Sequence, residues 1–254
     1  MSTSVIDIGH KVVSNAEWLE ARKKFLAKEK ELTRLRDELS RQRIELPWER
    51  VEKEYVFDGP NGKETLSDLF GGRSQLLIYH FMFGPEWKEG CQSCSLIADN
   101  MDGSLVHLAN RDVTLMAVSR ATLPQIEAFK KRMGWRFKWV SSNANDFNWD
   151  YHVSFTKDEM AGGKMHYNFA ESTFPSDEGP GISAFYKNES GELFHTYSTY
   201  ARGGDMLINT YNYLDLAPKG RNEEGLAYPM AWVRHHDKYE VQVHAGSCCA
   251  GEHV

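Results

Sequence analysis

Two cysteines separated by two residues, Cys91 and Cys94, are the first candidates for chemistry in this 254-residue chain. They follow an apolar run, Leu76 to Phe83, that is rich in aromatic and branched residues and ends at Gly84-Pro85. Such a run predicts a buried central strand, and the segment after Cys91 can be helical. A Cys-x-x-Cys at the start of a helix is typical of redox chemistry, because the free main-chain N–H groups there favour a thiolate. We therefore expect Cys91 to be the nucleophile and Cys94 to resolve a mixed disulfide.

Two other interpretations of these cysteines stay open. Two cysteines at this spacing are half the ligand set of a structural zinc site, which Cys248, Cys249 or histidines would have to complete. The pair can also be buried and inert. The segment 235–254 combines Cys248 and Cys249 with four histidines, and such a composition can bind a soft metal. Adjacent cysteines have poor geometry for chelating one tetrahedral ion or for bonding to each other, so we expect no metal here.

The composition of the chain narrows the classes of function. Its formal net charge of −6 gives no electrostatic case for nucleic-acid binding. No apolar run approaches the ~20 residues that cross a bilayer, so we expect no membrane-spanning segment. The first residues lack a basic flank followed by an apolar stretch, and four cysteines do not form a disulfide scaffold in a chain of this size. We therefore expect a cytoplasmic protein, where a Cys-x-x-Cys pair is more often catalytic than structural.

The pattern of apolar residues divides the chain into three parts. Residues 1–45 form an arm and a long helix, which begins after Ser14, with Glu17 completing a capping box, and runs to about Arg43. This helix makes a homodimer plausible. Residues 46–240 form the main domain, and residues 241–254 form a tail without a packing pattern.

In the main domain, the pattern of apolar residues predicts strands that alternate with helices. Strand, helix, strand, helix, strand implies a parallel sheet, and in open sheets of this kind the site lies at the carboxyl ends of the strands. An irregular polar segment at 141–180 and a second hairpin at 182–198 follow. The expected elements before them are a hairpin at 51–66, the strand at 76–83, a helix from 91 to 108 that Asp102-Gly103 can interrupt, a strand at 113–119, a helix at 122–134 closed by Gly134, and a strand at 137–140.

Longer motifs connect the chain with a known family. The order of elements is that of a thioredoxin fold with the N-terminal additions of peroxiredoxin-like proteins, and residues 15–239 resemble a bacterial thioredoxin-like family described as predicted dithiol–disulfide oxidoreductases. The resemblance implies an α/β fold with a central mixed sheet flanked by helices, extended by the N-terminal helix and hairpin. The motifs that carry it are GCQSCS at 90–95, GWRFKWVSS at 134–142, DFNWDYHVSF at 146–155, HTYSTYARG at 195–203, LDLAPKGR at 214–221 and WVRHHDKY at 232–239.

The resemblance also implies roles for three further residues. Pro180 stands where thioredoxins carry a cis-proline that contacts the substrate backbone, which predicts a cis Gly179-Pro180 bond. Trp87 corresponds to a tryptophan beside the first cysteine and is a candidate for substrate binding. Arg202 can stabilise a thiolate or an anionic substrate, as an arginine does near the peroxidatic cysteine of peroxiredoxins. The buried carboxylate that thioredoxins hold behind the cysteines has no counterpart in the strand, where His80 is expected to be a core residue.

We therefore expect a thiol–disulfide oxidoreductase without a cofactor, whose partners are a disulfide or peroxide substrate and a cellular dithiol reductant. A thiol peroxidase is a close alternative, although the pattern Pro-x-x-x-Thr/Ser-x-x-Cys is absent, since Gly84 and Trp87 stand seven residues before the two cysteines. A copper carrier that uses the Cys-x-x-Cys pair and a distant histidine is a second alternative. A non-catalytic protein that binds a small ligand with the aromatic segment 146–155 is a third.

Overall fold

The computed structural model describes residues 9–240, and the chain divides into two compact units after Pro47. The first unit contains one long helix, α1 (Asn15–Ile44), and its start was predicted correctly. The Glu17 N–H donates to the Ser14 hydroxyl at 3.3 Å, and the Glu17 carboxylate accepts from the Ser14 N–H at 3.0 Å. This capping box satisfies main-chain donors that the first turn of a helix leaves free.

In the second unit, the described residues form one eight-stranded sheet in the order β1-β10-β9-β4-β5-β6-β2-β3. The central strands β4, β5 and β6 run parallel, as the alternation of strands and helices predicted, while β9 and β10 are antiparallel. This mixed sheet, with the cysteines after its central strand β4, is a thioredoxin-like fold. The bounds are β1 Glu49–Arg50, β2 Val56–Gly59, β3 Gly62–Thr65, β4 Gln75–His80, β5 Val113–Ser119, β6 Lys138–Ser141, β9 Gly181–Lys187 and β10 Leu193–Tyr200.

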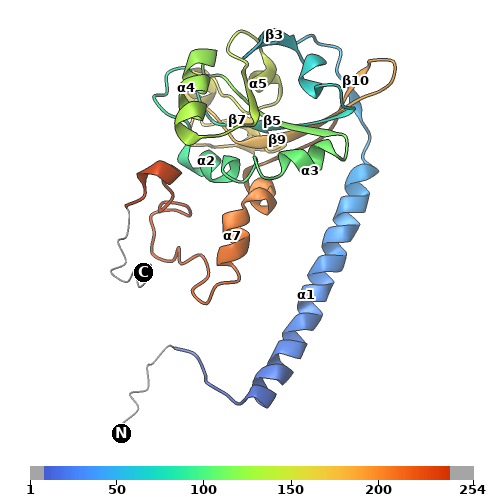
Figure 1. Cartoon of the computed structure of the whole chain (residues 1–254). Coiled ribbons are helices and arrows are strands. Elements are labelled where there is room, and N and C mark those ends of the chain that lie inside the picture. The colour runs from blue at the N-terminus through green and yellow to red at the C-terminus, as the bar shows by residue number, and fades with distance from the viewer. Residues whose placement is uncertain (1–8, 241–254) are drawn as a thin grey trace, which may run out of the picture. The chain divides into compact units, whose positions relative to one another are not determined.

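Helices cover both faces of the sheet (Figure 1). The predicted helix after Cys91 is interrupted, because a turn at 99–104 separates α2 from α3. The helix predicted at 122–134 is α4, and Gly134 ends it in the left-handed conformation at φ 67°. The bounds are η1 Asp68–Phe70, α2 Gln92–Ala98, α3 Leu105–Ala109, α4 Leu123–Met133, α5 Phe147–Asp150, α6 Lys157–Gly162, η2 Ala201–Leu207, α7 Asn209–Leu214 and η3 His236–Lys238.

Side chains from successive positions of β4 enter different cores, because neighbouring residues of a strand point to opposite faces. Tyr79 packs on one face in an aromatic core with Cys94 of α2 and Phe129 of α4. Ile78 packs on the other face in a core with Phe147 of α5. The cysteines therefore lie on the face that α2 and α4 cover.

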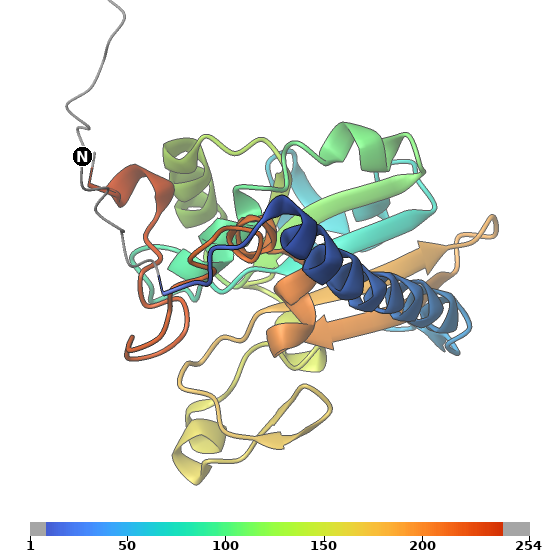
Figure 2. The ribbon, with the colours of Figure 1, turned by 90° about the horizontal axis from the view of Figure 1, so that it is seen from below.

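The irregular segment predicted at 141–180 contains small elements of its own. It holds α5, α6 and a hairpin of β7 (Met165–Tyr167) and β8 (Ala170–Ser172). Figure 2 shows α6 and the β7–β8 hairpin, in yellow, extending away from the main sheet. Among the residues described, none of the helices is long and apolar enough to cross a membrane.

Candidate functional site

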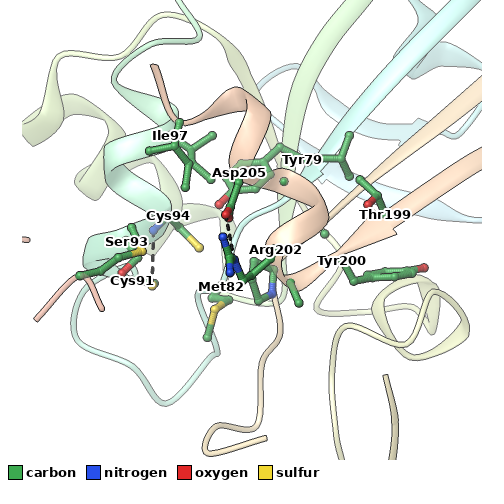
Figure 3. Close-up of a pocket in the computed structure, with 17 residues that line it drawn as sticks. Tyr79, Met82, Cys91, Ser93, Cys94, Ile97, Thr199, Tyr200, Arg202 and Asp205 are labelled. Atoms are coloured by element: carbon green, nitrogen blue, oxygen red, sulfur yellow. Dashed lines mark hydrogen bonds and ion pairs between the residues drawn. The ribbon is translucent and has the colours of Figure 1, made fainter. Parts of the chain in front are cut away.

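Cys91 and Cys94 lie beyond the carboxyl end of β4, where a loop leads into α2 (Figure 3). Cys91 caps the helix, since its sulfur accepts a hydrogen bond from the Cys94 N–H at 3.5 Å. Its own N–H donates to the Met82 carbonyl at 3.0 Å, which fixes the loop against the end of the strand. Both residues are free thiols; Cys91 is half-buried and Cys94 is buried. Cys91 is thus the more accessible residue of the pair.

The surroundings shift the pKa values of the two thiols in opposite directions. A hydrogen bond from the Cys94 thiol is the main cause that lowers the pKa of Cys91 to about 7, and the N–H groups of Cys94 and Ser93 add to it against the effect of burial. Burial raises the pKa of Cys94 well above its ordinary value, and the neighbouring Cys91 raises it further. When the pair loses its first proton, the negative charge therefore resides on Cys91 and the remaining proton on Cys94.

Tyr79 is a further residue in contact with this pair. Its side chain is buried, and its hydroxyl has no hydrogen-bond partner among the described residues. Burial raises the pKa of Tyr79 well above 10, so the hydroxyl keeps its proton. Against the effect of burial, the donor groups of the Tyr79 side chain and the Met82 main chain lower the pKa of Cys94. Tyr79 therefore offers a protonated, unpaired hydroxyl in the core that holds Cys94.

The residue before the nucleophile is held from the far end of the described chain. The Gly90 carbonyl accepts a hydrogen bond from the buried His235 side chain at 2.9 Å. A Cβ at Gly90 would lie 2.6 Å from Phe81 and 2.8 Å from Phe129, so only glycine fits. Arg132 contacts the His235 ring at 3.3 Å and pairs with the Glu89 carboxylate at 2.5 Å. The loop that carries Cys91 is therefore fixed on both sides.

A pocket of about 220 Å³ opens beside both cysteines. Its wall is largely apolar and comes from α2, β9, η2 and the segment that follows α7. At its rim the Arg202 guanidinium pairs with the Asp205 carboxylate at 3.0 Å, and Figure 3 shows these two side chains facing each other. Its apolar lining side chains include Met82, Ile97, Ile182, Ile208 and Met230.

Pro180 lines this pocket, but the prediction of a cis bond before it was wrong: the Gly179-Pro180 bond is trans. The trans form is intrinsically favoured by about 0.5–1 kcal/mol, and only specific surroundings reverse that preference. Here the Gly179 N–H donates to the Val153 carbonyl at 2.8 Å, and the Pro180 carbonyl accepts from the Tyr167 hydroxyl at 2.7 Å. These bonds hold the segment in its trans form.

A buried carboxylate fixes the approach to Pro180. Glu178 is 1% exposed, accepts from Arg120 Nε at 2.6 Å and accepts from the Ser154 hydroxyl at 2.8 Å. Burial raises the pKa of Glu178 to about 7, against the lowering effect of Arg120 and Ser154. Arg120 also lies over the Trp149 ring, 4.3 Å from its centroid. The ion pair thus secures the segment whose end lines the pocket.

The other residues predicted from the sequence take different positions. Arg202 lines the pocket at its rim, where its side chain is 87% exposed. Trp87 is half-buried outside this lining and donates from Nε1 to Asp177 at 3.2 Å, so it contacts the segment before Pro180. Its assignment to substrate binding stays a prediction.

His80 and the two glutamates of the loop before Cys91, Glu86 and Glu89, are the other titratable residues near the pair in sequence. His80 faces the opposite side of the sheet from Tyr79, where burial lowers its pKa to about 3 and its Nε2 lies 2.8 Å from the Ser183 hydroxyl. It is therefore a neutral core histidine. Glu86 is exposed, and Glu89 belongs to the ion pairs described above.

Sequence reasoning missed two residues of the site. Tyr79 was detectable, because strand alternation places it on the same face as Phe81, toward the helix that the cysteines begin. His235 was marked only by its position in a family motif, since the sequence gives no signal that it reaches Gly90. Within residues 9–240, no group of three or more histidines, cysteines and carboxylates is placed to hold a metal ion. The adjacent pair Cys248 and Cys249 lies outside the described residues.

The fold and the site define a thioredoxin-like α/β protein that carries a pair of neighbouring thiols. The chain belongs to the family described as bacterial protein of unknown function, DUF899, whose model matches residues 8–239. A search of curated proteins found no match.

Solved structures of similar arrangement include two peroxiredoxins. A cysteine-to-serine mutant of peroxiredoxin Q from Xanthomonas campestris has 13% identity and a TM-score of 0.42, with 62% of this chain and 90% of that chain covered. Peroxidoxin BcpB from Mycobacterium tuberculosis has 9% identity and a TM-score of 0.42, with 64% and 94% covered. A hypothetical protein from Sinorhizobium meliloti has 14% identity and a TM-score of 0.36, with 58% and 68% covered. These similarities concern the arrangement of the chain alone, and the chemistry rests on its own residues.

Proposed function

We propose that this protein is a thiol–disulfide oxidoreductase in which Cys91 is the nucleophile and Cys94 the resolving thiol. The observation that carries the proposal is the asymmetry of the pair. Cys91 is half-buried at a pocket with a pKa of about 7, whereas Cys94 is buried behind it with a raised pKa. A thiolate, not a thiol, attacks disulfides, so the accessible sulfur is the one prepared to react.

In the first step, the Cys91 thiolate attacks one sulfur of a substrate disulfide. A bond forms between Cys91 and that sulfur, the substrate disulfide breaks, and the other substrate half leaves as a thiolate. The pocket beside Cys91, with Pro180 in its wall and Arg202 at its rim, is where we place the substrate.

In the second step, Cys94 attacks the Cys91 sulfur of the mixed disulfide. Forming that disulfide removes the negative charge on Cys91, which is one cause of the raised pKa of Cys94. Cys94 can then give its proton to the departing substrate thiolate, while the Tyr79 hydroxyl and the Met82 main chain stabilise the developing sulfur charge. The products are a Cys91–Cys94 disulfide and two substrate thiols, and a cellular dithiol restores the reduced pair.

The test detects the mixed disulfide directly. The protein and its Cys91→Ser and Cys94→Ser variants are mixed with a disulfide, quenched with acid and analysed by mass spectrometry, all with Cys248→Ser and Cys249→Ser. We expect the parent to lose two hydrogens, Cys94→Ser to keep one substrate half, and Cys91→Ser to stay unmodified. A parent that forms no internal disulfide in any glutathione buffer would overturn the proposal.

A parallel reaction with hydrogen peroxide separates the peroxidase alternative. In that chemistry Cys91 becomes a sulfenic acid, which Cys94 condenses to the same disulfide with loss of water. A Cys94→Ser variant that gains one oxygen much faster than a free thiol does would favour the peroxidase. Stoichiometric retention of copper by the full chain would favour the metal carrier.

A further inference from the structure

The pocket beside Cys91 limits what can carry the reacting disulfide. Its volume of about 220 Å³ lies below the ~300–1,000 Å³ of pockets that enclose drug-sized ligands. An apolar cavity of ~150 Å³ holds benzene, so this one accommodates a ring-sized group or a short alkyl chain. Met82, Ile97 and Ile208 are among the side chains that such a group would meet.

The charged side chains at the rim of the pocket pair with each other. Apart from the reacting Cys91 thiolate, Arg202 and Asp205 are the charged residues in the lining, and they lie 3.0 Å apart. A charged substrate would have to break this pair or leave its own charge unpaired against apolar walls, which costs free energy. The lining therefore favours an uncharged substituent.

The main chain next to the pocket is already bonded within the protein. The Phe155 N–H donates to the Asp177 carbonyl at 2.9 Å, and the Gly179 N–H donates to the Val153 carbonyl at 2.8 Å. Residues 153–155 are therefore already paired with the segment that leads to Pro180. A polypeptide substrate that binds by strand addition needs such groups free.

The main-chain groups closest to the pocket are also hydrogen-bonded within the protein. The Pro180 carbonyl accepts from the Tyr167 hydroxyl at 2.7 Å, and the same hydroxyl accepts from the Ala201 N–H at 3.0 Å. The next strand, β9, pairs with β4 on one side and β10 on the other. An extended peptide would thus meet main-chain groups that are already paired.

We propose that the substrate is a low-molecular-weight disulfide with uncharged, apolar substituents, and not an extended polypeptide. This inference rests on the proposed function. One substituent fills the pocket while its sulfur meets the Cys91 sulfur. The protein dithiol is oxidised to the Cys91–Cys94 disulfide, and the substrate is reduced to two thiols that take up the two protons.

The experiment compares three disulfides in single turnovers at pH 7: dipropyl disulfide, oxidised glutathione and insulin. Each rate of protein oxidation is divided by the rate at which dithiothreitol reduces the same disulfide, which removes differences in intrinsic reactivity. We expect the normalised rate for dipropyl disulfide to exceed the other two by about tenfold or more. A normalised rate for insulin or oxidised glutathione that equals or exceeds it overturns the inference and leaves the proposed function intact. Oxidation by none of the three would overturn the proposed function itself.

Two variants test whether the pocket determines the preference for an apolar disulfide. Met230→Lys places a cation in the half-buried apolar lining, so the rate with dipropyl disulfide should fall and that with anionic oxidised glutathione should rise, each at least threefold. Leu216→Lys, at a position 84% exposed and outside the lining, is the matched control and should change neither rate. Equal effects of the two variants, with unchanged circular dichroism, would contradict the proposed position of the substrate.

Discussion

Replacing Cys94 tests what gives the nucleophile its low pKa. The first cause of the pKa of about 7 at Cys91 is the hydrogen bond from the Cys94 thiol. Cys94→Ala removes this donor but keeps the main-chain N–H groups of both residues 93 and 94. Cys94→Ser keeps a hydroxyl donor at the same place. We therefore expect the pKa of Cys91 to rise toward the ordinary thiol value of about 8.5 in Cys94→Ala and to stay near that of the parent in Cys94→Ser.

The expected change in the pKa of Cys91 determines which quantity the experiment should measure. At pH 7, a pKa of about 7 makes about half of Cys91 a thiolate, whereas a pKa of about 8.5 leaves about 3%. The more basic thiolate is also intrinsically more nucleophilic, by roughly four- to sixfold for this change. The alkylation rate at pH 7 should therefore fall only about three- to fourfold, while the midpoint of the pH profile should move by about 1.5 pH units.

The assay is alkylation by iodoacetamide from about pH 5.5 to 9.5, read by mass spectrometry on the peptide that contains Cys91. Cys248 and Cys249 are replaced by serine in every variant, so that each protein carries the same background. Coinciding midpoints for Cys94→Ala and Cys94→Ser would refute the assignment of the effect to the hydrogen bond. A parent midpoint near 8.5 or higher would refute the low pKa itself.

Three further predictions concern the surroundings of the pair. Tyr79→Phe should slow closure of the mixed disulfide by about 5- to 30-fold, the value of a ~1–2 kcal/mol hydrogen bond, without lowering stability to urea; an unchanged closure rate would exclude the hydroxyl as a donor. Gly90→Ala should cost about 1–3 kcal/mol in urea unfolding, because its Cβ would overlap Phe81, and a cost near zero would show that the loop can yield. Arg120→Ala should lower the free energy of unfolding by roughly 3 kcal/mol at pH 8 and by less at pH 6. The pKa of Glu178 in the folded protein lies above its unfolded value, so protonation of Glu178 stabilises the folded variant at low pH, and this contribution is lost as pH rises. Calorimetry at both pH values checks the sign.

Local patterns in the sequence predicted the elements that carry the cysteines. The run from Leu76 to Phe83 and the following Cys-x-x-Cys placed the thiols after the central strand, because burial and turn signals are local. The capping box at Ser14 and the glycine at Gly134 likewise marked ends of helices correctly, since each depends on contacts within one turn.

Contacts between distant segments were not predictable in this way. The pairing of 153–155 with 177–179, the segment that leads to Pro180, was not visible because both segments are polar and irregular in sequence. The pocket wall depends on how the segments that carry Ile208 and Met230 pack against α2, and no periodic pattern in the sequence predicts this packing. The sequence located the thiols, but the shape of the space beside them required the tertiary structure.

The bond between His235 and Gly90 also sets an order of events during synthesis. The two residues are separated by 145 positions, so Cys91 leaves the ribosome long before the side chain that holds its loop has been made. At about 5–20 residues per second this delay lasts roughly 7–30 seconds. During that interval the loop lacks one of its two anchors, and the thiol pair acquires its final geometry only when almost all of the described chain has emerged. The loop of the thiol pair thus gains its second anchor late, although its own residues are made 145 positions earlier.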